Sequence, residues 1–190
     1  MFPAILVQNY EINMYLFCSA LYFSYLCRKI YQSMKEVELK SVIHECQMQE
    51  LTADEQHLIE LAIEATQRSY APYSNFHVGA AVRLDNGIEI IGCNQENAAY
   101  PVGLCAERTA LFTAGAQYPD TPVCMLAIAA RATDGELTFE PTGPCGSCRQ
   151  VIIESETRAK APIRILLYGR RWVYVINGIR KLMPLTFSEF

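Results

Sequence analysis

Apolar residues recur with two different periods in the part of the chain that begins near residue 50. From Leu58 to Ala65 they recur every three or four residues, which predicts an amphipathic helix over about 53–68. Thr52 and Glu55 stand at its start with the spacing of a capping box, in which each side chain satisfies a free backbone amide. The folded region is therefore expected to open with a helix.

Short apolar runs bounded by turn residues predict strands, and Asp85-Asn86-Gly87 separates two of them as a hairpin turn. Two further helices are predicted, one at about 106–114 with Gly115 as its stop and one at about 146–155 after Pro144. The predicted strands cover about 78–84, 88–93, 123–130, 163–168 and 172–176. Alternating helices and strands imply an α/β fold, with a central sheet covered by helices.

Residues 1–33 do not share this pattern. They hold only three charges, at Glu11, Arg28 and Lys29, and residues 12–27 form an uncharged run of 16 residues. At about 1.5 Å per residue, a helix of this length spans roughly 24 Å, short of the roughly 30 Å hydrocarbon core of a bilayer. The acid precedes the apolar run and the basic pair follows it, whereas a signal peptide has basic residues before its apolar stretch.

Three interpretations of residues 1–33 stay open. The favoured one is an upstream extension without a role in chemistry, as an incorrectly assigned start codon would produce, because Met34 opens an ordinary polar stretch. A membrane anchor is the second, and its basic pair would then place the rest of the chain in the cytoplasm. A packed helix is the third. The expected division is an extension over 1–33 and one folded domain over 34–190, with a core at about 50–187.

Composition limits the class of protein. The chain has 190 residues, of which 51% are apolar and 19% charged, enough for one domain with a sizeable core and too apolar for intrinsic disorder. A net charge of −4 argues against long nucleic acids, whose binders carry a surplus of basic residues. The eight cysteines do not form a dense disulfide framework, so a reducing, cytoplasmic location is expected.

Two short motifs at predicted helix starts carry the candidate chemistry, Cys105-Ala106-Glu107 and Pro144-Cys145-Gly146-Ser147-Cys148. Cys145 and Cys148 can grip one ion from a single turn, Cys105 adds a third thiolate, and zinc takes thiolates readily. Helix N-termini favour the thiolate form. Three ligands with an open fourth position are typical of catalytic zinc, whose bound water is more acidic than bulk water. Glu107 stands close enough to reach that water without binding the metal.

Charge counting predicts a role for two arginines. Two positive charges on zinc against three thiolates leave a net negative charge, which would make the metal a poorer acid. Arg108, three residues after Cys105, and Arg149, directly after Cys148, are placed to donate hydrogen bonds to sulfur and offset that charge. Replacing either arginine by glutamine is expected to raise the pKa of the bound water and to slow turnover.

Four separated blocks of sequence resemble the cytidine deaminases of the small, homotetrameric, all-cysteine zinc class. The Cys-x-Glu and Pro-Cys-x-x-Cys pair is the signature of the zinc deaminases that act on nucleobases. The resemblance covers about residues 50–187. The four blocks are residues 73–81, 92–101, 105–110 and 144–150.

The resemblance implies both a fold and a reaction. The fold is a three-layer α/β/α arrangement around a mixed sheet of about five strands. The reaction is the hydrolysis of cytidine and 2′-deoxycytidine to uridine and 2′-deoxyuridine with release of ammonia, a step of pyrimidine salvage. One zinc ion per chain would be held by Cys105, Cys145 and Cys148. Zinc-bound hydroxide would attack C4 of the base, and Glu107 would move protons to N3 and to the leaving amine.

The resemblance also implies which groups hold the nucleoside. Asn94 and Glu96 match residues that hold the ribose hydroxyls, and Phe76 matches an aromatic residue that packs on the base. The backbone amide of Ala106 matches a donor to the base carbonyl. Asn97 belongs to the same block and is expected to take part in substrate binding.

Tyr100 and Phe187 resemble residues that complete the site of a neighbouring subunit. A homotetramer with shared sites is therefore implied, which would also explain the apolar tail around Phe187. The expected partner is a small nucleoside, with no nucleic acid, and no membrane is expected to contact the catalytic domain.

Plainer interpretations stand beside these assignments. The three motif cysteines could form a structural zinc clip or be reduced core thiols, and Glu107 could be a carboxylate favoured by the helix dipole. Asn94 and Glu96 could be a turn pair after a strand, and Phe76 could be ordinary core. The two arginines could lie on a solvated surface or in an intersubunit salt bridge. The three histidines are interpreted as polar surface or packing residues.

Two rival functions follow from these alternatives. One is another deaminase of the same fold that acts on an aminonucleoside antibiotic such as blasticidin S, on a free base or on a polynucleotide. The acidic balance argues against the polynucleotide, and Asn94 with Glu96 favours a nucleoside over a free base. The other rival is a non-catalytic protein in which zinc only holds the fold, and such a protein has no need of Glu107.

Overall fold

The computed structural model describes residues 20–26, 28 and 35–188. Contacts divide the chain into two compact units, Met1–Leu39 and Lys40–Phe190. In the first unit residues 20–26 are helical, with exposed side chains. The interpretations of residues 1–33 fall mostly outside the described residues. Across the part of the chain that the structure describes, no helix combines the length and the apolar character needed to cross a membrane.

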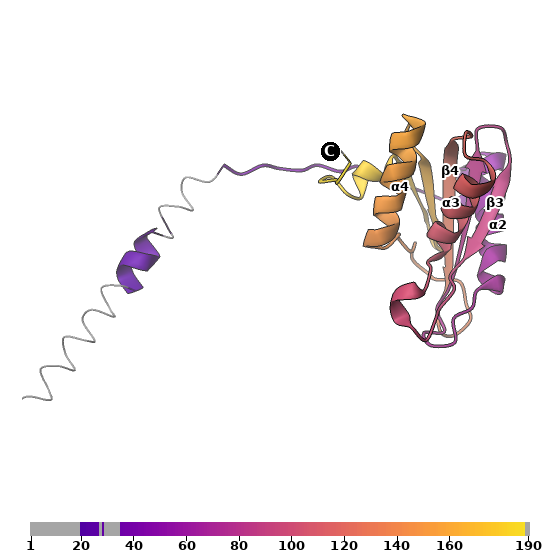
Figure 1. Ribbon diagram of the computed structural model, residues 1–190, viewed down its shortest axis with the longest axis horizontal. Helices are drawn as coiled ribbons and strands as arrows, with labels where there is room; N and C mark the ends of the chain where they lie inside the picture. The colour runs from indigo at the N-terminus through magenta and orange to yellow at the C-terminus, as the bar shows by residue number, and fades with distance from the viewer. Residues whose placement is uncertain (1–19, 27, 29–34, 189–190) are drawn as a thin grey trace, which may run out of the picture. The chain divides into compact units, whose positions relative to one another are not determined.

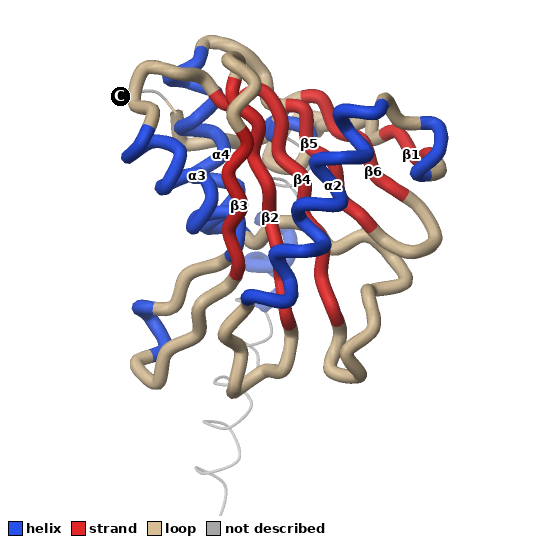
Figure 2. The backbone as a smooth tube through the Cα atoms, turned by 90° about the vertical axis from the view of Figure 1, so that its right-hand side faces the viewer, coloured by secondary structure: helices blue, strands red, loops and turns tan. Residues whose placement is uncertain are grey.

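A six-stranded mixed sheet lies at the centre of the second unit (Figure 2). The strands run in the order β1-β6-β5-β4-β2-β3. β4 and β5 are parallel, and the other neighbours are antiparallel. The strands are β1 (His44–Cys46), β2 (His77–Leu84), β3 (Glu89–Cys93), β4 (Val123–Arg131), β5 (Arg164–Tyr168) and β6 (Val173–Asn177).

Helices cover both faces of this sheet, as Figures 1 and 2 show. The helix α2 (Ala53–Ala65) packs on one face, and α3 (Ala106–Gln117) and α4 (Gly146–Ala159) pack on the other. Successive residues of a strand point to opposite faces. Accordingly, Leu166 of β5 belongs to the core under α2, whereas Ile165 belongs to the core under α3 and α4. The predicted three-layer α/β/α fold is confirmed.

The number of strands differs from the prediction of about five. The five predicted strands correspond to β2 through β6, and the sheet gains β1 at its edge. This strand has three residues, and its His44 and Glu45 are exposed and polar. It forms by antiparallel pairing with β6, in which His44 lies opposite Val175. A strand that depends on such a distant partner leaves no periodic pattern of its own in the sequence.

The three helices begin where they were predicted to begin, whereas their ends, at Ala65, Gln117 and Ala159, differ from the predicted 68, 114 and 155. The capping box of Thr52 and Glu55 is present at the start of α2. Gly115 does not stop α3, which continues to Gln117. The helix α4 ends at Lys160 in the left-handed conformation, with φ of 52°. The 3-10 helices are η1 (Met48–Glu50), η2 (Thr66–Arg68), η3 (Tyr100–Val102) and η4 (Ile179–Lys181).

Two strand glycines allow helices to approach the sheet closely. A Cβ atom on Gly79 would lie 2.0 Å from the carbonyl oxygen of Ala62 in α2. A Cβ atom on Gly92 would lie 2.4 Å from the backbone nitrogen of Ala110 in α3. Neither distance is compatible with a side chain, so the depth at which α3 sits on the sheet depends on Gly92. The start of α3 carries Cys105 and Glu107, and this packing therefore sets their position.

Candidate active site

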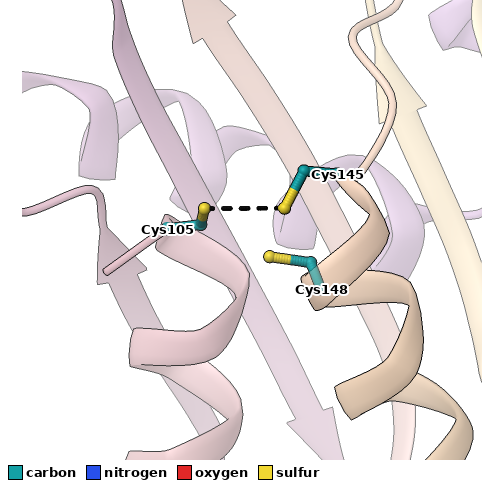
Figure 3. A group of neighbouring side chains, drawn as sticks. All are labelled: Cys105, Cys145 and Cys148. Atoms are coloured by element: carbon teal, nitrogen blue, oxygen red, sulfur yellow. Dashed lines mark hydrogen bonds between the residues drawn. The ribbon is translucent and has the colours of Figure 1, made fainter. Parts of the chain in front are cut away.

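Three cysteine sulfurs meet between the starts of α3 and α4 (Figure 3). Cys105 is the N-cap of α3, Cys145 is the N-cap of α4, and Cys148 lies in the first turn of α4. Their sulfur atoms all lie within 4.8 Å of one another, and those of Cys105 and Cys145 are 3.8 Å apart. The side chains project toward a common point, so two motifs separated by 40 residues form one cluster.

The protonation of these sulfurs is strongly biased. A hydrogen bond from the Cys148 thiol lowers the pKa of Cys105 to about 5, and Arg108 and Cys145 add to the effect against the opposing influence of burial. The same hydrogen bond, together with burial and the charge of Glu107, raises the pKa of Cys148. Cys105 is therefore the thiolate of the cluster and Cys148 a donor to it.

The donor set fits a zinc ion. Sulfur is a preferred zinc ligand, and three thiolates around one centre leave room for a fourth, non-protein ligand. Of the described residues, only these three cysteines form a group of metal-ligating side chains of this kind. Both helix N-termini point at the cluster and favour negative charge there. The arrangement is that of an open site, as catalytic zinc requires.

Glu107 is the buried acid of the site. It lies in the first turn of α3, its exposed fraction is 4%, and it lines the same cavity as Cys105 and Cys145. Burial raises the pKa of the Glu107 carboxyl, and the negative charge of Cys105 raises it further. A carboxyl group held in this way can carry a proton at a pH where an exposed glutamate has lost it.

The two arginines have different partners. Arg108 donates from Nη2 to the sulfur of Cys105 at 3.5 Å and to the carbonyl of Gly103 at 3.3 Å. Its Nε is buried and has no hydrogen-bond partner within the described residues. Arg149 donates instead to the carbonyls of Pro144 at 2.9 Å and Leu182 at 2.8 Å.

The predicted hydrogen bond from Arg149 to sulfur is therefore wrong for the described residues. Arg149 fixes the backbone next to Cys145 and ties it to the C-terminal segment. The expectation failed because Leu182 lies 33 residues away in sequence and competes for the guanidinium. Of these two arginines, Arg108 is the one that donates to a sulfur of the cluster in the described part of the chain.

A cavity of about 790 Å³ opens beside the sulfur cluster. Most of the residues singled out from the sequence line it, and they come from the loop after β3 and from the starts of α3 and α4. The singled-out residues in its lining are Asn94, Glu96, Asn97, Tyr100, Cys105, Glu107, Arg108 and Cys145. The volume is that of a pocket for a small molecule.

The two polar residues after β3 are held firmly. Oε2 of Glu96 accepts hydrogen bonds from the backbone nitrogens of Tyr73 at 2.9 Å and Ser74 at 3.3 Å. Hydrogen bonds from Ser74 and Tyr73 lower the pKa of the Glu96 carboxyl, so it is a carboxylate at neutral pH. Oδ1 of Asn94 accepts a hydrogen bond from the backbone nitrogen of Val78 at 2.7 Å.

The remaining predicted residues differ in their exposure and in whether they line the cavity. Phe76 is half-buried, and its carbonyl accepts a hydrogen bond from Asn94. Ala106 is fully buried at the first position of α3. Tyr100 lines the cavity but is 92% exposed. Phe187 is 69% exposed, and its carbonyl accepts a hydrogen bond from Gln150.

Several wall residues were not singled out from the sequence. They include Tyr73 and Ser74, whose backbone amides orient Glu96, and Gln95 beside it. Tyr73 and Ser74 stand in one of the four resembling blocks, which was the available signal. Gln95 stands in another of these blocks, where the resemblance gave it no role of its own.

Comparison with known proteins assigns the family. The family described as "Cytidine and deoxycytidylate deaminase zinc-binding region" matches residues 52–161. A cytidine deaminase of Halalkalibacterium halodurans is 48% identical over 101 residues, which cover 53% of this chain and 71% of that protein. A cytidine deaminase of Sporosarcina psychrophila is 42% identical over 137 residues, which cover 72% of this chain and 93% of that protein.

Solved structures agree with the sequence relatives. The crystal structure of cytidine deaminase from Burkholderia pseudomallei superposes with a TM-score of 0.61 at 39% identity, covering 72% of this chain and all of that one. That of cytidine deaminase from Mycobacterium tuberculosis gives a TM-score of 0.56 at 29% identity, covering 73% of this chain and all of that one.

Proposed function

The chain belongs to the cytidine and deoxycytidylate deaminase family, and from that premise we infer that its cavity hydrolyses cytidine and 2′-deoxycytidine to uridine and 2′-deoxyuridine. One water is consumed and one ammonia is released per turnover. The observation that carries this function is a cluster of three cysteine sulfurs beside a cavity of about 790 Å³, which Cys105, Cys145 and the buried Glu107 line.

Cys105, Cys145 and Cys148 would hold a zinc ion, which when bound would supply a Lewis acid that makes water a nucleophile near neutral pH. Arg108 keeps the Cys105 sulfur anionic by donating a hydrogen bond to it. Arg149 holds the Pro144 carbonyl and so the backbone that presents Cys145.

Glu107 moves the protons of the reaction. Its carboxylate takes one proton from the attacking water and gives it to N3 of the base. It then takes the second proton of that water, from the new hydroxyl at C4, and gives it to the amine, which leaves as ammonia. Burial supports this role, because a raised pKa brings the acid and its conjugate base closer in energy at neutral pH. Because Glu107 is buried, its carboxyl group exchanges protons with the reacting groups and not with bulk water.

The loop after β3 holds the sugar. Glu96, a carboxylate, accepts from a sugar hydroxyl, and Asn94 donates to it, which suits a group that both donates and accepts. Asn97 lines the same wall. On the base, Phe76 supplies an aromatic face and the Ala106 amide a donor to the carbonyl.

The test is the fall in ultraviolet absorbance when the purified protein converts cytidine to uridine. Wild type is expected to turn over cytidine and 2′-deoxycytidine, and Glu107→Gln is expected to lose at least 100-fold in kcat while still binding zinc. Cytosine and blasticidin S are assayed in parallel, and a preference for either would replace the nucleoside assignment. Equal inactivity of both proteins with zinc bound would leave the metal a structural role only.

We further propose that the enzyme is a homotetramer with shared active sites. The support is apolar surface at the cavity rim, where Tyr100, Val102 and Leu104 are 92%, 62% and 37% exposed. An exposed apolar loop beside a binding site is typical of an interface. Sedimentation across a dilution series, with activity measured in the same samples, tests this proposal, and a fully active monomer would contradict it.

Residues 1–33 are proposed to lie outside the catalytic domain, which spans 34–190. The separation of contacts between Leu39 and Lys40 supports this division. A chain that begins at Met34 is expected to keep the activity, zinc content and melting temperature of the full chain. Mass spectrometry of the natural N-terminus then distinguishes an untranslated extension from an intact anchor in membrane fractions.

A cytoplasmic location is part of the same proposal. Six cysteines in the described part of the chain are free thiols, and three of them form the metal cluster, which a reducing compartment preserves. Thiol counting on protein isolated from the cell, without added reductant, is expected to find the cluster reduced.

A further inference from the structure

A chain of side-chain hydrogen bonds leads from His77 to the wall of the cavity. Nδ1 of His77, the first residue of β2, lies 3.1 Å from Oγ of Ser69. Oγ of Ser69 lies 2.5 Å from Oδ1 of Asn94. His77 and Ser69 do not themselves line the cavity, whereas Asn94 does. Side chains from three separate segments thus meet behind one residue of the substrate pocket.

The orientation of the Asn94 amide is fixed by its backbone partners. The Val78 nitrogen donates to Oδ1 at 2.7 Å, and Nδ2 donates to the Phe76 carbonyl at 2.9 Å. A backbone N–H can only donate and a carbonyl can only accept. The oxygen and nitrogen of this amide therefore cannot be exchanged.

This orientation sets the direction of the whole chain. Because Oδ1 of Asn94 only accepts, the single hydrogen of the Ser69 hydroxyl must point to it. Toward His77 the Ser69 oxygen can then only accept, so Nδ1 of His77 must carry a hydrogen. The direction runs from His77 through Ser69 to Asn94.

These contacts leave Asn94 with one hydrogen-bonding group that is available to a ligand. Its oxygen is occupied by two donors, and one hydrogen of Nδ2 is used by Phe76. The other hydrogen of Nδ2 is what Asn94 can offer to a ligand. Glu96, with its lowered pKa, is the matching acceptor on the same wall. A hydroxyl between them would receive from Asn94 and donate to Glu96.

We propose that His77 and Ser69 are positioning residues for substrate binding, which fix Asn94 as a pure hydrogen-bond donor to a sugar hydroxyl. The proposal rests on the proposed nucleoside deaminase function. It assigns a role in recognition of the sugar to two residues outside the cavity. They act on the sugar through Asn94 and have no part in the chemistry at the base. Their loss should therefore weaken binding of the sugar more than turnover.

The kinetic test compares two substrates across four variants. Ser69→Ala and His77→Leu break the chain, whereas Ser69→Thr and His77→Asn retain a hydroxyl and a donor. For cytidine the two breaking variants are expected to raise KM about threefold to tenfold, the effect of one hydrogen bond, with kcat changed less than twofold. The two conservative variants should recover most of the loss. The variant that combines Ser69→Ala with His77→Leu should raise KM no more than either single substitution, because both residues act through one chain of hydrogen bonds.

The second substrate is 2′,3′-dideoxycytidine, which has neither hydroxyl for Asn94 to bind. Its KM is expected to be the same in all variants, and Ser155→Ala, which removes a serine hydroxyl in α4, should alter neither substrate. Equal changes for both substrates, or an unchanged KM for cytidine, would overturn the proposal while leaving the deaminase function intact. A wild-type protein without deaminase activity would overturn the proposed function itself, and this inference with it.

A readout independent of activity is the tautomer of His77 by nitrogen-15 NMR. The ring is expected to carry its hydrogen on Nδ1 in wild type and in Ser69→Thr. Ser69→Ala should release this preference. A hydrogen on Nε2 alone in wild type would contradict the direction of the hydrogen-bond chain.

Discussion

Replacing Gly92 by alanine tests how the fold positions the catalytic groups. Gly92 lies in β3 under α3, and an added Cβ would stand 2.4 Å from the nitrogen of Ala110 and 2.6 Å from the oxygen of Ala106. Both atoms belong to the helix backbone and cannot rotate away. The helix itself must move, and it carries Cys105 and Glu107 at its start.

The size of the movement follows from the distances. Ordinary contact begins at 3.4 Å, so α3 must retreat by about 1 Å from its present 2.4 Å. A misplacement of about 1 Å at catalytic groups can cost about 100-fold in activity. Overpacking of a tight interface costs about 1–3 kcal/mol of stability. We therefore expect Gly92→Ala to lower kcat/KM by about 100-fold and to lower zinc affinity.

The assay combines cytidine turnover, zinc content and thermal unfolding. The matched control is Gly115→Ala in the same helix, where the nearest atom to an added Cβ is Nη1 of Arg158 at 3.6 Å. This control should keep full activity, and its stability should rise by up to about 1 kcal/mol, since alanine favours a helix over glycine. Wild-type activity and zinc affinity in Gly92→Ala would refute the claim that the depth of α3 sets the site.

Three further outcomes follow from the structure. Removing zinc with a chelator should abolish activity and lower the melting temperature, and added zinc should restore both. At a zinc concentration 1,000-fold above Kd, the bound ion contributes about 4 kcal/mol to the free energy of unfolding. Unchanged activity after zinc removal would exclude a catalytic metal. Arg149→Gln should lower stability by about 1–3 kcal/mol and weaken zinc binding, because it frees the carbonyls of Pro144 and Leu182, and a shift only in the pH–rate profile would contradict this backbone role. Burial alone would raise the pKa of Glu55, but hydrogen bonds from Thr52 and from Arg164, at 2.5 Å, lower it below its ordinary value. The Glu55 carboxylate contributes about 1–2 kcal/mol to stability, fully above the unfolded pKa of about 4.3, and this contribution is lost as the pH falls through the lower folded pKa. Glu55→Gln should therefore be less stable than wild type at pH 7 and similar to it near pH 2. Denaturant unfolding at both pH values measures this difference.

Local pattern predicted the elements that are determined locally. The short apolar run that forms β2 and the capping box of α2 follow from neighbouring residues, and both elements are present. The end of α3 was wrong because tertiary packing outweighed the helix-breaking tendency of Gly115. The strand β1 was missed because its three residues gain their conformation from β6.

In the candidate site, too, the features that depend on nearby residues could be predicted and those that depend on distant ones could not. The sulfur cluster was predictable, since two motifs with fixed internal spacing constrain three ligands and Glu107 at helix starts. The partners of Arg149 were not, because the Leu182 carbonyl competes from a distant segment. The hydrogen-bond chain from His77 to Asn94 could not be predicted from the sequence either, because it joins three segments that only the folded structure brings together.

The most direct test of the central claim is X-ray absorption spectroscopy at the zinc edge on the metal-loaded protein. We expect three sulfur ligands at about 2.3 Å and one lighter oxygen or nitrogen ligand, which cytidine analogues should perturb. Four sulfur ligands, or a zinc ion without sulfur ligands, would contradict an open three-cysteine site and the hydrolysis assigned to it.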